Sequence, residues 1–476
     1  MFIGPLEVGV VRDWAPVSGP VVSWQPTAAT LEKARQAPTS DVPPSYMQAQ
    51  HIRGYRDQTS SGLDYSRLLI VTCDIAGRCD IRAMTYLINT HLRRHDTYRS
   101  WFEYDDAQQI VRRTMPNPSD IEFVPTEHGD LTSAEFHDRV LATPDPLQWD
   151  CFRFGFVQGP EHFTFYVSVD HLHMDGMFAG TLVSEFHMMY NALVGGGAPP
   201  PLPEAGSYED YCVRQQRETS DFTLESPEVR AWIEFAENNN GSFPEFPLPL
   251  GDPSVPCPGQ LMSTQLLNEE QGLRFESACI EAGARFSGGV FACSALAEHE
   301  FTGAKTYYGA TPVDIRSTPE EFLTVGWFTG MIPITVPVAA TSFGDTVRAA
   351  QKSFDSAGNL AKVPFDRVVE LAPWLSGLRP NFSILNYFDG GVAPLSGMFT
   401  PLLEKINLGL WFDGRYSYQF SIFVNRMEKE TAMTILFPDN PVARESVAKY
   451  LEVMKSVYAR IADGHDAVRP RNAAQA

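Results

Sequence analysis

The sequence predicts a mixed α/β protein in which two sandwiches of similar size are joined in one chain. Three observations favour this fold class: strand-like and helix-like segments alternate in both halves, a stretch rich in glycine and proline separates the halves, and the composition is that of a folded protein. Hydrophobic residues make up 43% of the 476 residues and charged residues 20%. Such a chain can bury a large core, so disorder as the main state is excluded.

In the first half, runs of apolar and β-branched residues predict strands, and apolar residues at helical spacing predict helices. Between Gly195 and Tyr208, glycines end the last helical pattern and prolines prevent another, so we place a domain boundary there. The predicted domains are residues 1–200 and 201–476. The predicted strands of the first half are 66–75, 96–104, 108–115 and 163–171, and its predicted helices are 82–95 and 177–194.

The second half repeats this mixture of patterns. A long helix is expected over 208–240, followed by a proline-rich but ordered crossing loop over 243–259, whose apolar residues would not stay in water. Two further helices and four strands are then expected, which completes the second sandwich. The helices are 268–283 and 287–301, and the strands are 261–267, 331–338, 381–388 and 416–424.

Charge and cysteine usage restrict the possible partners and the compartment. There are 58 Asp and Glu against 37 Lys and Arg, and this net charge of −21 opposes binding to nucleic acid. Seven cysteines, scattered and without a C-x-x-C pair, indicate reduced thiols in the core. No signal peptide and no apolar run long enough to span a bilayer is found. We therefore expect a cytoplasmic, soluble protein.

One histidine occupies a position that favours catalysis. Residues 163–171 alternate as a strand does, so that Phe163, Phe165, Val167, Val169 and His171 share one face. A helix is predicted directly afterwards. His171 therefore lies where a strand passes into a helix, on the side that packs inward.

His171 begins the pattern H-x-x-x-D-G, which ends at Asp175 and Gly176. This short pattern has little specificity by itself, and it leaves two other interpretations open. His171 could be a core histidine bonded to backbone carbonyls. Alternatively, His171, His173 and Asp175 would share one face of a continued strand and could bind a metal, although metallo-β-lactamases have a histidine where this chain has Gly176.

Other polar motifs carry weaker signals. The run "HLRRH" from His91 to His95 is the densest basic cluster of the first half, and we expect a solvated helix end there, with binding of coenzyme A phosphates as the alternative. "HEFTG" at His299 lacks the second histidine of a zinc-binding helix and is expected at an ordinary helix surface. The sequence contains no G-x-S-x-G elbow for a serine nucleophile.

The chain around His171 resembles the superfamily of coenzyme A-dependent acyltransferases and condensation domains, whose signature is H-H-x-x-x-D-G. Asp170 stands where that signature has its first histidine, and His171 matches the second. More narrowly, the chain resembles the mycobacterial polyketide-associated acyltransferases, in particular the group that esterifies trehalose. The segments that carry the broader resemblance are "PPSYMQAQ", "HLRRHDTYRSWF", "PLQWDCFRFGFV", "DIRSTPEE" and "GWFTGMIPITV", and those that carry the narrower one are "VPPSYMQAQHIRGY", "GSFPEFPLPLGDPS" and "FPDNPVARESV".

The resemblance implies two chloramphenicol acetyltransferase-like domains with a tunnel between them. It implies that His171 is the general base, with no covalent acyl-enzyme, and that Asp175 and Gly176 form the motif turn. Asp175 would pair with Arg316 of the second domain, whereas residue types alone also allow Asp175 to cap the following helix. Further residues expected at the tunnel are Asp170, His173 and Trp327, the last of which could equally be core.

The same resemblance implies the substrates. A long-chain acyl group, palmitoyl-type or methyl-branched, would move from a thioester to a hydroxyl of trehalose, one step in making a cell-envelope glycolipid. The donor would be acyl-coenzyme A or a polyketide synthase carrier domain, used as cosubstrate with no further cofactor. A lipid transporter and the inner face of the plasma membrane are further contacts that the resemblance suggests. The alternatives are a stand-alone condensation domain and a non-catalytic scaffold that binds acyl carriers.

Overall fold

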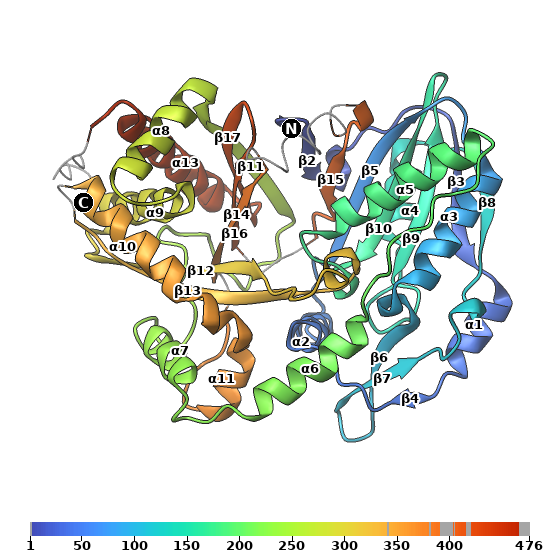
Figure 1. Ribbon diagram of the computed structural model, residues 1–476, viewed down its shortest axis with the longest axis horizontal. Helices are drawn as coiled ribbons and strands as arrows, with labels where there is room; N and C mark the ends of the chain where they lie inside the picture. Colours follow the sequence, from blue (N-terminus) through green and yellow to red (C-terminus); the bar gives the residue numbers. More distant parts are fainter. Residues whose placement is uncertain are drawn as a thin grey trace.

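The computed structural model describes residues 2–339, 342–379, 382–390, 403, 405–415 and 420–465. Figure 1 shows two halves side by side, each with its own sheet and covering helices. The first half contains an eight-stranded sheet in the order β1-β2-β15-β5-β10-β9-β3-β8. Its strands are β1 (Phe2–Ile3), β2 (Leu6–Val10), β3 (Pro20–Pro26), β5 (Leu68–Ala76), β8 (Phe123–Asp130), β9 (Phe152–Gln158), β10 (His162–Asp170) and β15 (Gly409–Phe412).

The two faces of this sheet are covered by different helices. Alternate residues of β9 and β10, including Phe154 and Phe165, point into a core shared with α3 (Ile81–Arg94) and α5 (Phe178–Val194). On the opposite face, Tyr166 packs against Phe136 of α4 (Ser133–Leu141). Apolar residues of α5 at the predicted helical spacing are buried, as expected for a helix that covers a sheet.

A smaller sheet and two helices complete the first half. The strands β4 (Thr39–Ser40), β7 (Ile110–Thr114) and β6 (Ser100–Tyr104) pair in that order. The helices are α1 (Ala28–Arg35) and α2 (Tyr46–Ser60). A capping box between Ser45 and Gln48 begins α2, because each side chain bonds the other residue's backbone amide.

The second half is built on a four-stranded sheet and a long hairpin. The sheet has the order β11-β17-β16-β14, in which β14 and β16 are parallel. The hairpin β12–β13 reaches from this half towards the first (Figure 1). The strands are β11 (Gly259–Asn268), β12 (Thr306–Asp314), β13 (Thr329–Pro337), β14 (Ser383–Asp389), β16 (Phe420–Arg426) and β17 (Glu430–Pro438), and the helices are α8 (Glu269–Glu281), α9 (Phe286–Thr302), α10 (Phe343–Ser356), α11 (Phe365–Leu371) and α13 (Pro441–Ala462).

The chain crosses between the halves more than once. After β14, it returns to the first sheet, where β15 lies between β2 and β5, parallel to the former and antiparallel to the latter. The division of the chain near residue 200, as inferred from the glycine and proline run, stays a prediction. Residues 409–412 are nevertheless a segment of the second half that pairs within the first sheet.

The prediction of one long helix over 208–240 is wrong. Two helices occupy this segment, α6 (Tyr208–Ser220) and α7 (Pro227–Glu237). Pro227 stands in the first turn of α7, where the missing N–H costs nothing, and it prevents continuation of α6.

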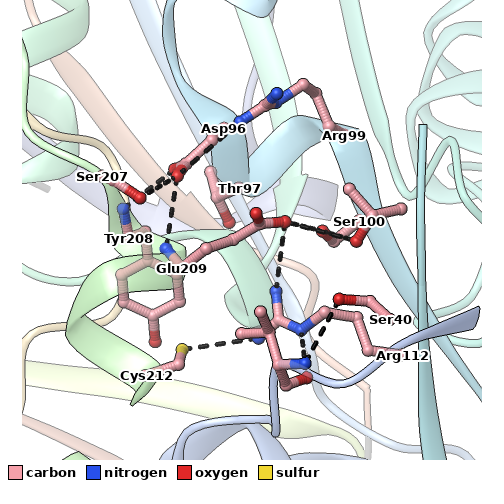
Figure 2. A network of polar contacts seen from close by, with 12 residues as sticks. Ser40, Asp96, Thr97, Arg99, Ser100, Arg112, Ser207, Tyr208, Glu209 and Cys212 are labelled. Atoms are coloured by element: carbon pink, nitrogen blue, oxygen red, sulfur yellow. Dashed lines mark hydrogen bonds and ion pairs between the residues drawn. The ribbon is translucent and has the colours of Figure 1, made fainter. Parts of the chain in front are cut away.

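Helix α6 is tied to the first half at its beginning (Figure 2). The Asp96 carboxylate accepts hydrogen bonds from the amides of Tyr208 and Glu209, at 2.9 and 3.2 Å, and from the Ser207 hydroxyl at 2.6 Å. An acidic side chain is favourable there because the first amides of a helix lack partners within the helix. The buried Arg112 contacts Cys212 one turn further on.

The other predicted elements agree with the structure in type and within a few residues in position, except that residues 96–99 of the predicted strand 96–104 form a 3₁₀ turn before β6. Residue 381 and residues 416–419 of the predicted strands lie outside the described part. Phe243, Phe246 and Leu250 of the proline-rich loop are buried, so this loop is ordered as predicted. All seven cysteines are free, and five of them are buried as predicted, whereas Cys79 and Cys257 are only half-buried. No helix within the described residues is both long and apolar enough for a membrane span.

Candidate active site

His171 is the first residue after β10 and begins a short 3₁₀ turn, His171–His173. Its amide donates to the carbonyl of Arg67 at 2.8 Å, which holds the turn against the start of β5. The ring of Trp327, which comes from the second half just before β13, lies 4.1 Å from the His171 ring between centroids. His171 is half-buried, and its Nδ1 atom is enclosed without a hydrogen-bond partner among the described residues.

The surroundings of His171 keep its imidazole neutral. Burial lowers the pKa to about 4, and the ring of His51 contributes in the same direction. The residue's own backbone carbonyl and the Asp170 carboxylate favour the charged form and offset only part of this effect. At neutral pH the side chain is therefore a proton acceptor and is not already protonated.

Asp170 is completely buried and ionised. Its Oδ1 atom lies 2.7 Å from His51 Nε2 and accepts the amide of Leu172 at 3.0 Å, and its Oδ2 atom accepts Arg67 Nη1 at 2.9 Å. Although burial alone would raise the pKa of Asp170, His51 and Arg67 outweigh it and lower the pKa to about 2. Asp170 was expected at the tunnel, but no part of its side chain is accessible in this structure.

His173 is equally inaccessible. Its Nδ1 atom lies 2.9 Å from the Thr97 hydroxyl, and its Nε2 atom lies 3.2 Å from the Cys151 sulfur. Burial lowers the pKa of His173 to about 4. The side chain was expected at the tunnel, but the structure places it in the core beneath the turn. Trp327 is 8% exposed and contacts His171, so its side chain has a core position next to the site.

The structure brings Asp175 and Arg316 together across the two halves. Arg316 Nη1 lies 2.8 Å from Asp175 Oδ2, which also accepts the amide of Phe328 at 2.9 Å. Asp175 Oδ1 accepts the amide of Met177, close to the start of α5, so the carboxylate also bonds the beginning of the helix. Gly176 is exposed in the same turn. The ion pair thus joins the histidine turn to the segment that carries Trp327.

Sequence reasoning missed three residues that support the site. His51 and Arg67 bind Asp170, and Asp413 at the end of β15 accepts the amides of Arg67 and Leu68 at 2.8 and 3.0 Å. His51 stands in the segment "VPPSYMQAQHIRGY" that carried the resemblance, which was the available signal. Nothing in the local pattern around Arg67 or Asp413 relates them to His171.

The interpretation of "HLRRH" as a solvated helix end is wrong. His91 and His95 are buried and contact the buried carboxylate of Glu185 at 2.8 and 3.2 Å. The side chain of Arg94 also reaches Glu185, at 2.8 Å. These side chains lie in the core between α3 and α5, because the Glu185 carboxylate there pairs with His91, His95 and Arg94.

The spacing of His91, His95 and Glu185 would also suit a metal, since one ligand atom from each lies within 4.8 Å of the others. Each nitrogen nevertheless has a partner in the protein. His91 Nε2 contacts the Tyr98 hydroxyl, and His95 Nδ1 accepts the amide of Val325. The earlier metal hypothesis involved His171, His173 and Asp175, and these side chains do not converge among the described residues, because Asp175 faces Arg316 and His173 faces Thr97.

The two layered halves and the buried H-x-x-x-D-G turn between them define a condensation-domain fold. The family model described as "Condensation domain" matches residues 64–387, so the chain belongs to this family. It is 60% identical over 97% of its length to "Acyltransferase PapA3" of Mycobacterium tuberculosis, of which it covers 98%. It is 55% identical over 96% of its length to "Trehalose-2-sulfate acyltransferase PapA2" of Mycobacterium bovis, of which it covers 98%.

Solved structures agree with these relatives. "PapA2 acyl transferase" superimposes with a TM-score of 0.93 at 54% identity, with 96% of this chain and all of that chain (100%) covered. A condensation domain from the polyketide synthase MokA superimposes with a TM-score of 0.67 at 14% identity over 90% of this chain and 99% of that one, which shows the shared fold alone. The chain is an O-acyltransferase, similar to the acyltransferases of mycobacterial glycolipid synthesis.

Proposed function

We propose that this enzyme transfers a long-chain acyl group from a thioester to a hydroxyl of trehalose or of a trehalose derivative, with His171 as general base. The neutral, half-exposed imidazole of His171 at the junction of the two halves is the observation that carries the chemistry. The names of the relatives support the acceptor, because two of them act on sulfated trehalose. The product would be an acylated trehalose of the cell envelope.

The arrangement of the His171 ring assigns its two nitrogens. Since Nδ1 is enclosed by protein, Nε2 is the nitrogen that a substrate can reach. Nε2 would take the proton of the sugar hydroxyl as the oxygen attacks the thioester carbonyl carbon. The carbon–sulfur bond then breaks, and the imidazolium returns the proton to the departing thiolate. No acyl-enzyme forms and no further cofactor takes part.

Asp170 would have a positioning role in this reaction. It holds His51 and Arg67, and the Arg67 carbonyl accepts the amide of His171. The carboxylate therefore fixes the turn from behind, where its charge is neutralised by Arg67. A base held in one orientation is effective because misplacement of the reacting groups by about 1 Å can cost about 10²-fold in rate.

The decisive experiment offers the purified enzyme palmitoyl-coenzyme A together with trehalose, trehalose 2-sulfate or glucose, and identifies the products by mass spectrometry. We expect acyl transfer to a trehalose acceptor well above transfer to glucose, since a site that hydrogen-bonds two rings leaves polar groups unpaired with one ring. Free coenzyme A should appear in equal amount. An aminoacyl acceptor on a carrier protein should be inert.

Two results would contradict the proposal. Transfer to an amine on a carrier protein, with both trehalose acceptors inert, would indicate a stand-alone condensation domain. Binding of acyl carriers without turnover would indicate a scaffold. To test whether the donor is a polyketide synthase product, the assay is repeated with the same acceptors and a carrier-bound acyl donor in place of palmitoyl-coenzyme A.

A further inference from the structure

A cavity of about 480 Å³ with a mixed polar and apolar lining lies between α4 and the face of the first sheet opposite α3 and α5. Its floor is formed by Ser23 of β3, Arg153 of β9 and Tyr166 of β10, and its wall by one face of α4. On that helix, Glu135, Asp138 and Arg139 line the cavity at helical spacing. Leu131 and Ala142 complete the lining, but charged groups are unusual between a helix and the sheet that it covers, so their presence requires an explanation.

The floor is shaped by a glycine. Ser23, Gly155 and Tyr166 are direct neighbours across the three strands. A Cβ atom at Gly155 would lie 2.4 Å from the Tyr166 ring, so only glycine allows the phenol to lie across β9. Tyr166 is 1% exposed, yet its hydroxyl has no hydrogen-bond partner among the described residues and borders the cavity.

Arg139 supplies a buried polar atom without a hydrogen-bond partner in the described part of the chain. Its Nε atom is buried without a partner, and no carboxylate of the described residues forms an ion pair with its guanidinium. Its charge nevertheless acts on the neighbours that surround the cavity: it lowers the pKa of His128, where burial is the larger cause, and it opposes the rise in the pKa of Tyr166 that burial produces. Buried polar groups without partners mark places where a ligand or water completes the hydrogen bonds.

The charges of the lining decide the class of ligand. Arg139 and Arg153 are opposed by Glu135 and Asp138, and Arg153 already pairs with Asp150 at 3.0 Å. The cavity therefore has no net positive charge with which to attract an anion. It presents donors and acceptors in similar number, which suits a ligand whose hydroxyls both donate and accept. Its volume lies within the range of small-molecule sites.

We propose that this cavity is a binding site for a neutral carbohydrate of one or two sugar rings, separate from the acyl-transfer site. The Arg139 guanidinium and the Tyr166 hydroxyl would bond the sugar hydroxyls. The proposal does not rest on the identity of the acyl acceptor, because none of the residues that line the cavity is among those that contact His171. It adds a second carbohydrate site to the enzyme.

The test combines crystals soaked with trehalose or glucose and titration of the same sugars in solution by calorimetry. We expect electron density for the sugar in contact with Arg139 and Tyr166. Arg139→Leu and Tyr166→Phe should each weaken binding at this site by about tenfold, the usual effect of losing one hydrogen bond to a ligand. Tyr166→Phe keeps the ring over Gly155, so the fold should be retained. Arg82→Leu, on the exposed side of α3, is the matched control and should bind as the parent does.

A second arm separates this site from the catalytic one. The titration is repeated in His171→Ala. This variant lacks the proposed base and should lose acyl transfer, but its cavity is unchanged. Sugar binding that persists there and weakens by about tenfold on adding Arg139→Leu supports the proposal. An empty cavity in sugar-soaked crystals, or inorganic sulfate that occupies the cavity and displaces the sugar, would overturn it. Unchanged binding in Arg139→Leu and Tyr166→Phe would overturn it equally.

Discussion

His171 depends on residues that lie far from it in the sequence. Its ring contacts Trp327, its amide is held by Arg67, and Asp170 beside it is neutralised by Arg67 and His51. The family signature has a histidine where Asp170 stands, and a histidine there could not bind two cationic or hydrogen-bonding partners in the same way. A carboxylate at this position therefore requires its buried arginine, since an unpaired buried charge is strongly unfavourable.

The motif spacing identifies His171 and Asp175, and the resemblance to the acyltransferase superfamily adds Arg316, so the three could be predicted as a group. His51, Arg67 and Asp413 could not be predicted from local pattern. Their contacts arise from strand register and from chain segments more than a hundred residues apart, as in the bond from Arg67 to Asp413. The resemblance places Asp170 and His173 at the tunnel. Their burial could not be predicted, because sequence spacing does not indicate which side chains a 3₁₀ turn buries.

The first prediction tests the base directly. His171→Ala should lower kcat by about 10²- to 10⁴-fold, because general-base catalysis contributes in that range. The melting temperature should stay close to that of the parent, since Nδ1 has no partner among the described residues whose bond would be lost. The measurement is release of free coenzyme A under saturating substrate. A variant that retains the full rate would refute the assignment.

The second prediction concerns pH. A base must be neutral, and the pKa of His171 is lowered to about 4, so its protonation should limit kcat/KM only as the pH falls towards 4. From pH 8 down to pH 5.5 the profile should show no acidic limb from this group. An ordinary histidine would instead give a limb near pH 6.5. Such a limb, if it persisted in variants of the other histidines, would mean that burial does not lower the pKa of His171 in the free enzyme.

At the scale of elements, the strands and helices with strong periodicity were predictable, whereas their boundaries and crossings were not. The alternation in 163–171 identified β10, and the apolar spacing after it identified α5. Helix-forming residues continue across Pro227, so the sequence predicts a single helix over 208–240. The position of α6 depends on hydrogen bonds between its first residues and Asp96 of the first half, which no local pattern indicates (Figure 2). The placement of β15 between β2 and β5 depends on tertiary pairing alone.

The third prediction concerns the junction between the turn after β10 and the start of β13. Asp175→Ala removes the partner of the buried Arg316 and the acceptor of the Phe328 and Met177 amides. Stranding a buried cation costs about 3–5 kcal/mol, so the melting temperature and kcat should fall together. Differential scanning calorimetry and the coenzyme A assay measure the two effects. The control, Asp314→Ala, removes a more exposed carboxylate that contacts the same arginine at 3.3 Å and should be milder.

A different result would change the role of Asp175. If Asp175→Ala kept the parental melting temperature but lost all turnover, the carboxylate would act in the reaction and not in the architecture. If Asp175→Asn restored both properties, hydrogen bonding to the backbone amides would matter more than the charge. The first outcome would contradict the structural role that we assign to the pair.

At the scale of the whole molecule, the junction of the two halves concentrates buried ionisable groups. Asp170, His171, His173 and Asp175 lie in one turn, and His95 bonds the amide of Val325 from the second half. Asp170, His173, Asp175 and His95 are buried and His171 is half-buried, so salt screens their charges much less than it screens the charges on the exterior. The junction should therefore dominate the dependence of stability on pH.

The last prediction is that the enzyme loses stability as the pH falls from 7.5 to 5.5. The pKa values of His95, His171 and His173 are each lowered to about 4 in the folded protein, with burial as the largest cause. In the unfolded chain these residues take up protons near pH 6.5, while the folded protein does not, so the unfolded state binds more protons throughout this window and is favoured by acid. Glu298, whose pKa burial raises to about 7, takes up a proton in the folded protein within this window and acts in the opposite direction, but this one group offsets only one of the three histidines. Urea unfolding at several pH values, above the pI of about 4.9, gives the free energy of unfolding. His95→Gln should flatten the dependence of the free energy of unfolding on pH, whereas His162→Gln, at a half-exposed position, should leave it unchanged. A free energy of unfolding that rises on acidification would contradict the prediction, because it would mean that the folded protein takes up more protons than the unfolded chain.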